Sequence, residues 1–331
     1  MKVAVFDTRR YDRESFDAAN VAYGHELKYF EPRLVDDTAA LAAKFPAICS
    51  FVNDKLDATT LRHLAAGGVR LIALRCAGYN HVDLQATAAL GLRVVRVPEY
   101  SPHAVAEHAV GLVLAVDRKI YRATARVRES NFSLEGLVGF DLFGKTVGIV
   151  GMGRIGRAAA RIFHGFGCLL LAHEAQPQPA EVADLPVRFV DRDELYRQSD
   201  IITLHVPLTP ATRHFIDHAA IAKMKRGVVL VNTSRGALID TPALIAALKT
   251  GHVGAAGLDV YEEEEGLFFR DLSDKVLQDD VLARLLTFPN VVVTAHQGFL
   301  TKEALAAIAD TTLANVKAFE EGRSLRHEVS Q

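Results

Sequence analysis

The stretch of residues 145–174 constrains the fold of this chain more than any other part of its sequence. It begins with an apolar run, TVGIV, which predicts a strand buried on both faces of a sheet. A G-x-G-x-x-G pattern follows, then a helical segment at 157–166, and then a second short apolar run, CLLLA, shortly before an acid, Glu174. Strand, glycine turn, helix, strand and acid, in this order, are typical of a dinucleotide-binding α/β unit.

The three glycines and the acid each have a physical role in such a unit. Gly151 permits the tight turn, Gly153 lets a pyrophosphate approach the backbone, and Gly156 lets the helix pack closely on the strand. The N-terminus of the helix offers free N–H groups to the phosphates. Glu174 can accept hydrogen bonds from ribose hydroxyls. A tight βα turn in another α/β fold is the alternative, but it leaves this acid unexplained.

Apolar runs that predict short strands alternate with helical segments along most of the chain. The first group of predicted strands comprises 2–6, 26–30, 47–51, 69–74 and 93–97, and the second comprises 146–150, 168–172, 187–190, 200–204, 227–231, 255–259 and 290–294. This alternation predicts two parallel sheets with right-handed crossovers. A long helix over 103–127, opened by Ser101 and Pro102, is expected to bridge the two groups. A last helix, over 302–321, is expected to return to the first group.

Length and composition exclude several classes of protein. The chain has 331 residues, which suggests about two domains, and half of them are hydrophobic. A net charge of −2 without a basic run argues against a nucleic-acid partner, and no apolar run reaches the length of a membrane span. The three cysteines form no C-x-x-C pair, which favours a reducing compartment. We therefore expect a cytoplasmic protein, and the spacing of His, Cys and acidic residues predicts no metal site.

Ligands of open α/β sheets bind beyond the carboxyl ends of the strands. The residues that directly follow the predicted strands are therefore the candidates for a functional site. They include 77–80, 205–207, 232–235 and 295–297, together with Glu174 and Asp259. These segments predict a site that contains one arginine and one histidine from distant parts of the chain.

Eight segments resemble the D-isomer-specific 2-hydroxyacid dehydrogenases. They stand in the family's order and span nearly the whole chain: RCAGYNHVDL, VPEYSPHAVAEHAVGL, NFSLEGL, GKTVGIVGMGRIG, SDIITLHVPLT, VNTSRGALID, GLDVYE and TAHQGFLT. Within the family, SLEGL and EEEEGLFF are similar to the D-lactate dehydrogenases. The resemblance implies two doubly wound parallel-sheet domains: a Rossmann-type NAD domain, 101–298, inserted in a flavodoxin-like substrate domain, 1–100 and 299–331, with a cleft between them. It also implies NAD as cofactor, reversible reduction of pyruvate to D-lactate, and a homo-oligomer, either dimer or tetramer.

The resemblance also assigns the catalytic residues. The family's substrate-binding arginine falls on Arg235, its acid on Glu264 and its acid/base histidine on His296. The planar guanidinium of Arg235 can hold a carboxylate, and a histidine can exchange a proton near neutral pH. Glu264 can accept the other ring N–H of His296 and favour the protonated ring. The rest of the acidic run 262–265 is expected to be solvated.

The remaining site residues are predicted around these three. The expected cofactor-binding residues are Gly151, Gly153, Arg154, Ile155, Gly156, Glu174, Val206, Pro207, Thr212, Thr233, Ser234 and Asp259. The expected substrate-binding residues are Ala77, Gly78, Tyr100, Arg235, His296 and Phe299, although interdomain packing is an alternative role for the two aromatic residues. His205 is expected to have no catalytic role. Glu174 stands where lactate members usually carry Asp, one methylene shorter.

Two other functions stay open at this point. The first is a dehydrogenase for larger D-2-hydroxy acids, and the second is an NAD(H)-sensing binding protein of the same fold. The size of the substrate pocket separates the first from a D-lactate dehydrogenase, and turnover separates both enzymes from the sensor.

Overall fold

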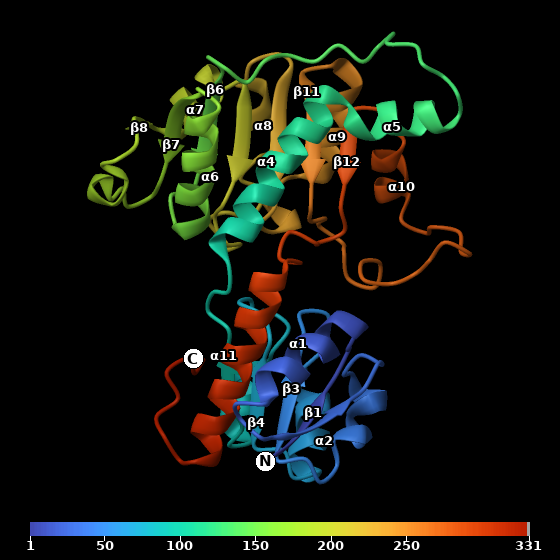
Figure 1. The fold of residues 1–331 in the computed structure, drawn as a ribbon, viewed down its shortest axis with the longest axis vertical. Coiled ribbons are helices and arrows are strands. Elements are labelled where there is room, and N and C mark those ends of the chain that lie inside the picture. Colours follow the sequence, from blue (N-terminus) through green and yellow to red (C-terminus); the bar gives the residue numbers. More distant parts are fainter. Residues whose placement is uncertain (330–331) are drawn as a thin grey trace. The chain divides into compact units, whose positions relative to one another are not determined.

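The computed structural model describes residues 1–329. The chain forms two compact units (Figure 1): Met1–Ser101 with the chain from Leu300 onward, and Pro102–Phe299. Each unit is built around one sheet in which all strand pairs are parallel, as the sequence predicts. No helix in residues 1–329 combines the length and the apolar character needed to cross a membrane.

The first unit contains a five-stranded sheet with the order β2-β1-β3-β4-β5, the flavodoxin-like order. Its strands are β1 (Lys2–Val5), β2 (Glu26–Tyr29), β3 (Ala47–Ser50), β4 (Leu71–Leu74) and β5 (Arg93–Arg96). Its helices are α1 (Arg10–Asn20), α2 (Ala58–Ala66), α3 (Leu84–Ala89) and α11 (Lys302–Glu320). Phe16 of α1 and Leu313 of α11 pack with Val5 and Ala73 in one buried cluster. The last helix therefore belongs to the first unit, as predicted.

The second unit contains a seven-stranded sheet with the order β12-β11-β10-β9-β6-β7-β8. Its strands are β6 (Thr146–Val150), β7 (Leu169–His173), β8 (Val187–Phe189), β9 (Ile201–Leu204), β10 (Val228–Asn232), β11 (Val253–Leu258) and β12 (Val291–Val293). Its helices are α4 (Pro102–Arg118), α5 (Ile120–Arg128), α6 (Arg154–Gly165), α7 (Arg192–Gln198), α8 (His218–Ala222), α9 (Thr241–Thr250) and α10 (Asp280–Leu286). The order reverses between β6 and β9, which is the switch point of a Rossmann-type sheet.

Helices cover both faces of this sheet (Figure 1). On one face, Val113 of α4 and Phe163 of α6 pack against Ile149 of β6. On the other face, α7 to α10 supply residues such as Leu195 and Leu244 to a second cluster. With both faces covered, the strand ends are where a ligand can reach the sheet.

The predicted long helix over 103–127 is wrong in one respect, because the structure has two helices there. Lys119 separates α4 from α5 with φ 50° and ψ 38°, in the left-handed region. Its ammonium group donates to the carbonyl oxygens of Asp117 and Val138, while the Asp117 carboxylate accepts from the Phe140 N–H at 2.8 Å. Contacts with residues 138–140, where the chain returns, thus end α4. The pattern of apolar residues within 103–127 gives no sign of these contacts.

Candidate active site

In the glycine turn after β6, two of the three glycines have no space for a side chain, and the third has open space beside it. Gly151 has φ +92°, and a Cβ atom there would lie 2.6 Å from the His205 carbonyl oxygen. A Cβ atom at Gly156 would lie 2.0 Å from the Gly151 carbonyl oxygen, so only glycine fits. A Cβ atom at Gly153 would meet nothing within 4 Å. Gly153 is also the N-cap of α6, which begins at Arg154, three residues earlier than predicted. The predicted residues Arg154 and Ile155 therefore form its first turn.

The acid at the end of β7 is held against this turn. Oε2 of Glu174 accepts a hydrogen bond from the Met152 N–H at 2.8 Å, and Oε1 accepts from the Ala175 N–H at 2.9 Å. The hydroxyl of Thr233, after β10, is buried and has no hydrogen-bond partner within residues 1–329. An open glycine, the N-terminus of a helix, an acid beside it and an unpaired buried hydroxyl together fit a bound dinucleotide.

The loop after β9 forms a second wall of this site. Val206 lies against the glycine turn, because a Cβ atom at Gly151 would be 2.7 Å from its Cγ1. The Thr212 hydroxyl donates to the Pro207 carbonyl oxygen at 2.7 Å and accepts from the Thr209 N–H at 2.8 Å, which closes the loop. Burial lowers the pKa of His205 to about 4, so this ring is neutral near pH 7.

Arg235 lies in a loop that is tied to two strands. The Ser234 hydroxyl donates to the Leu204 carbonyl oxygen at 2.9 Å, and the Asn232 side-chain amide donates to the Arg235 carbonyl oxygen at 2.8 Å. The Arg235 guanidinium donates to the Ser234 carbonyl oxygen at 2.7 Å. At Gly236, a Cβ atom would lie 2.0 Å from the carbonyl carbon of Tyr261. This close approach places the Arg235 loop beside the segment that carries Glu264.

Glu264 and His296 form a direct pair. Oε1 of Glu264 lies 2.9 Å from Nδ1 of His296, and its Oε2 accepts from the Tyr261 N–H at 3.2 Å. Their side chains are 21% and 17% exposed, so water reaches the pair only in part. An ionised carboxylate accepts hydrogen bonds but does not donate them, so Nδ1 carries a proton in this pair and Nε2 is left to exchange one.

The acidic run 262–265 is not uniformly solvated, contrary to expectation. Glu263 and Glu265 are exposed, but the Glu262 side chain is only 13% exposed. Its Oε1 accepts from Arg213 at 2.9 Å and lies 2.7 Å from Nε2 of His214. Both partners lie almost 50 residues earlier, so the local sequence of the run gives no sign of them.

The turn that carries His296 has a strained backbone. Ala295 and His296 both have positive φ, 53° and 63°, which costs about 1–2 kcal/mol per residue when side chains are present. Asp259 holds the turn: its carboxylate accepts from the N–H groups of Gln297 and Gly298, each at 2.8 Å, and its carbonyl oxygen accepts from the His296 N–H at 2.5 Å. The Asp259 carboxylate, which was predicted to bind the cofactor, therefore binds backbone N–H groups of the protein itself.

His108 and Thr294 complete the surroundings of Asp259 and were not predicted as site residues. Burial by itself raises the pKa of Asp259, but hydrogen bonds from His108 and Thr294 outweigh it, and the pKa lies below its usual range. The signal in the sequence was their place in two family segments: His108 is the histidine of the AEH triplet, and Thr294 is the first residue of TAHQGFLT.

The other predicted substrate residues belong mostly to the first unit. Ala77 and Gly78 follow β4, and the Ala77 carbonyl oxygen accepts from the Arg96 guanidinium at 2.8 Å. Tyr100, also in the first unit, is half-buried, whereas Phe299, the last residue of the second unit, is buried. Their part in substrate binding stays a prediction from the sequence.

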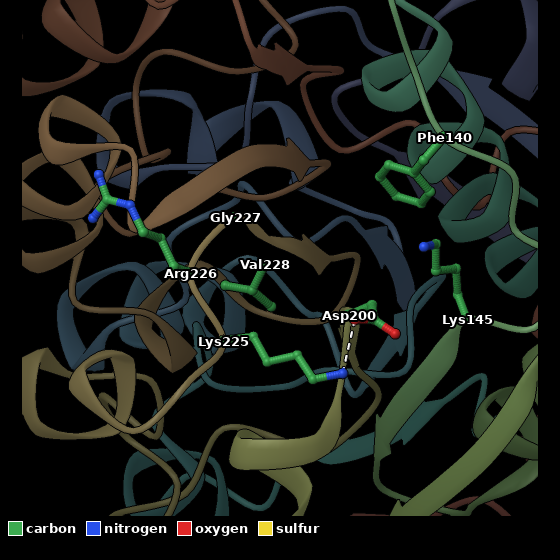
Figure 2. A pocket seen from close by; sticks show the side chains of 7 residues that line it. All are labelled: Phe140, Lys145, Asp200, Lys225, Arg226, Gly227 and Val228. Carbon is green, nitrogen blue, oxygen red and sulfur yellow. Dashed lines mark hydrogen bonds and ion pairs between the residues drawn. The ribbon is translucent and has the colours of Figure 1, made fainter.

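A cavity of about 140 Å³ lies at the amino ends of the strands of the seven-stranded sheet, away from the glycine turn (Figure 2). It is lined by Phe140, Lys145, Asp200, Lys225, Arg226, Gly227 and Val228. Figure 2 shows the Lys225 ammonium directed at Asp200, at 2.8 Å, while Arg226 extends away. These residues precede β6, β9 and β10 or begin them, so the cavity is at the amino ends of the strands and is separate from the glycine turn.

The chain is similar to known proteins over nearly its whole length. Residues 110–298 match the model of the D-isomer specific 2-hydroxyacid dehydrogenase, NAD binding domain. The chain is 52% identical over 320 residues to 2-hydroxyacid dehydrogenase homolog 1 of Schizosaccharomyces pombe, covering 96% of each chain. It is 50% identical over 329 residues to D-lactate dehydrogenase of Escherichia coli, covering 99% of this chain and 100% of the relative. A solved structure described as the pyruvate reductase of Chlamydomonas reinhardtii superposes with a TM-score of 0.94 at 46% identity, covering 98% of each chain.

The fold and the glycine turn define an NAD-dependent oxidoreductase. More closely, the chain belongs to the D-isomer-specific 2-hydroxyacid dehydrogenase family, which confirms the predicted family, fold class and cofactor.

Proposed function

We propose that this protein is a D-lactate dehydrogenase that interconverts pyruvate and D-lactate. The observation that carries the proposal is the 2.9 Å pair between His296 and Glu264. The segment that carries Glu264 lies beside the Arg235 loop. To convert a 2-oxo acid, the protein must bind its carboxylate and exchange a proton with its carbonyl oxygen. The names of the Escherichia coli and Chlamydomonas reinhardtii relatives support the choice of substrate.

Each of the three residues has one task in this reaction. The guanidinium of Arg235 holds the substrate carboxylate through two parallel hydrogen bonds and orients the carbonyl group. The ionised Glu264 keeps the Nδ1 proton of His296 in place, so Nε2 delivers its proton to the carbonyl oxygen during reduction and takes it back during oxidation. NAD, when bound, supplies the hydride exchange at the carbonyl carbon.

The division of labour between the two units is part of the same proposal. Pro102–Phe299 would hold the cofactor through Gly151, Gly153, Gly156 and Glu174, and the unit formed by Met1–Ser101 with the chain from Leu300 onward would be the substrate domain. The open position at Gly153 and the unpaired hydroxyl of Thr233 support the first part.

A series of 2-oxo acids of increasing chain length tests the proposal. The purified enzyme is given NADH and each acid in turn, and the loss of NADH absorbance gives kcat/KM. We expect the highest value with pyruvate. A maximum at a longer acid would identify a dehydrogenase for larger D-2-hydroxy acids. NADH binding without turnover of any acid would identify an NAD(H)-sensing protein.

We also propose that the protein is a cytoplasmic homo-oligomer. Large apolar side chains are exposed after α5, among them Phe132 (73%), Leu134 (79%) and Val138 (85%). Such a concentration of apolar surface is typical of a protein interface. The three cysteines are buried free thiols, which fits a reducing compartment. Light scattering should give a mass above that of one chain, and Leu134→Asp should lower it.

A further inference from the structure

One histidine of α4 reaches the anchor of the catalytic turn. The Nε2 atom of His108 lies 2.9 Å from the Thr294 hydroxyl and 3.2 Å from Oδ1 of Asp259. The Thr294 hydroxyl in turn donates to the same Oδ1 atom at 2.6 Å. The His108 side chain is 20% exposed and that of Asp259 is 2% exposed, so this cluster is largely shielded from water.

The directions of these hydrogen bonds follow from the chemistry of the groups. An ionised carboxylate only accepts, so the single hydroxyl proton of Thr294 points at Asp259. The Thr294 oxygen therefore has only lone pairs to offer His108, and Nε2 of His108 must carry a proton. That N–H lies within reach of both Thr294 and Asp259, and it fixes where Oδ1 can sit.

Oδ1 is also the atom that accepts from the Gln297 N–H, directly after the catalytic histidine. Packing adds a second link, because a Cβ atom at Gly298 would be 2.9 Å from Oδ2 of Asp259 and 3.4 Å from Cδ2 of His108. The His108 ring, the carboxylate and the turn are thus packed together with no room for another atom at Gly298. A shift of Oδ1 must move the backbone that sets the direction of the His296 ring.

We propose that His108 and Thr294 are positioning residues for His296: through Asp259 they hold the strained 295–298 turn in the conformation that pairs His296 with Glu264. This inference rests on the proposed function for its kinetic effect, because His296 is the residue that exchanges the proton. The strain at Ala295 and His296 explains why the turn needs this anchor, because a turn with two left-handed residues relaxes when its anchor loosens.

Three variants test the inference. His108→Phe keeps a ring but removes the donor, His108→Gln places an amide N–H near the position of Nε2, and Thr294→Val keeps the shape but removes the hydroxyl. His164→Phe, at an exposed position on α6, is the matched control. For each protein we would measure kcat and KM for pyruvate, the Kd for NADH, the melting temperature, and the NMR titration of the His296 ring in the absence of ligands.

We expect His108→Phe and Thr294→Val to lower kcat at least tenfold while KM and the NADH Kd change less than threefold. The His296 titration should move to lower pH, because a displaced ring loses contact with Glu264. His108→Gln should restore most of kcat, and His164→Phe should behave like the wild type. If His108→Phe does not fold, Thr294→Val gives the same readouts.

A lower melting temperature with unchanged kcat and an unchanged His296 titration would overturn the inference, because His108 would then only stabilise the fold. Failure of the proposed function gives a different pattern. In that case the wild type would not turn over any 2-oxo acid, while the NMR titration would still report whether His108 positions His296.

Discussion

Replacing Glu264 by Gln removes one charge from the pair with His296 and leaves its size and an acceptor oxygen. Reduction of pyruvate requires a protonated His296 ring, so its rate falls as pH rises. The ionised carboxylate, 2.9 Å from Nδ1, favours that protonated ring. Without the charge, the ring loses its proton more easily, and the alkaline fall in kcat/KM should begin at lower pH. The limb for D-lactate oxidation, which requires the neutral ring, should move in the same direction.

The size of this move follows from the strength of the hydrogen bond. A hydrogen bond to a charged group contributes about 1.5–3 kcal/mol, and a neutral one about 0.5–1.5 kcal/mol. Glu264→Gln therefore removes about 1–1.5 kcal/mol of preference for the protonated ring. Since about 1.4 kcal/mol corresponds to one pH unit, both limbs should move by about one unit. Partial exposure of the two side chains, 17% and 21%, argues against a larger effect.

The assay consists of full pH profiles of kcat/KM in both directions for the wild type and Glu264→Gln. Glu263→Gln is the matched control, because it removes a charge from the adjacent, exposed position. Limbs that stay in place in Glu264→Gln would refute the reasoning. Equal movement in Glu263→Gln would refute it too, since the effect would then come from the general negative charge of the run.

Three further predictions concern neighbouring groups. Arg235→Lys keeps the charge but loses the fork, so kcat/KM for pyruvate should fall about 10- to 100-fold, with an unchanged NADH Kd by fluorescence titration; a value near that of the wild type would remove Arg235 from substrate binding. Glu174 should repel a 2′-phosphate, and residues 175–180 contain no arginine to bind one, so kcat/KM should be higher with NADH than with NADPH; equal values would contradict the role of Glu174. Burial lowers the pKa of His205 to about 4, so the ring stays neutral at working pH and His205→Gln should leave both pH limbs in place; a moved limb would mean that His205 exchanges a proton in the reaction.

The sequence predicts the sheets of both units well, because buried parallel strands appear as short apolar runs between helical segments. Every predicted strand forms, and Glu174, Arg235 and Asp259 follow strand ends as the rule for open sheets requires. Ends of helices are harder to predict. The break at Lys119 depends on a contact with residues 138–140, and a periodicity measured along one segment cannot register it.

Polar contacts between residues far apart in the chain could not be predicted from the sequence either. Glu262 resembles its neighbours in an acidic run, and only the fold brings Arg213 and His214 to it. His108 resembles any histidine on a helix, and its link to Asp259 exists because α4 lies against β11 and β12, the strands that directly precede Asp259 and Thr294. The direct pair of Glu264 and His296 could be anticipated only through the family resemblance, since 32 residues separate them.

The position of the second unit within the chain determines the order in which the protein can fold during synthesis. Pro102–Phe299 is continuous, so its core can form as soon as residue 299 has left the ribosome. The first unit must wait, because Ala309, Leu313 and Val316 of α11 belong to the same buried cluster as Val3 and Val5 at the start of the chain. Until α11 emerges, the strands that were made first expose an apolar face and are the part of the nascent chain most open to aggregation. A nascent chain stopped at residue 299 should therefore hold a finished second unit and an unfinished first one.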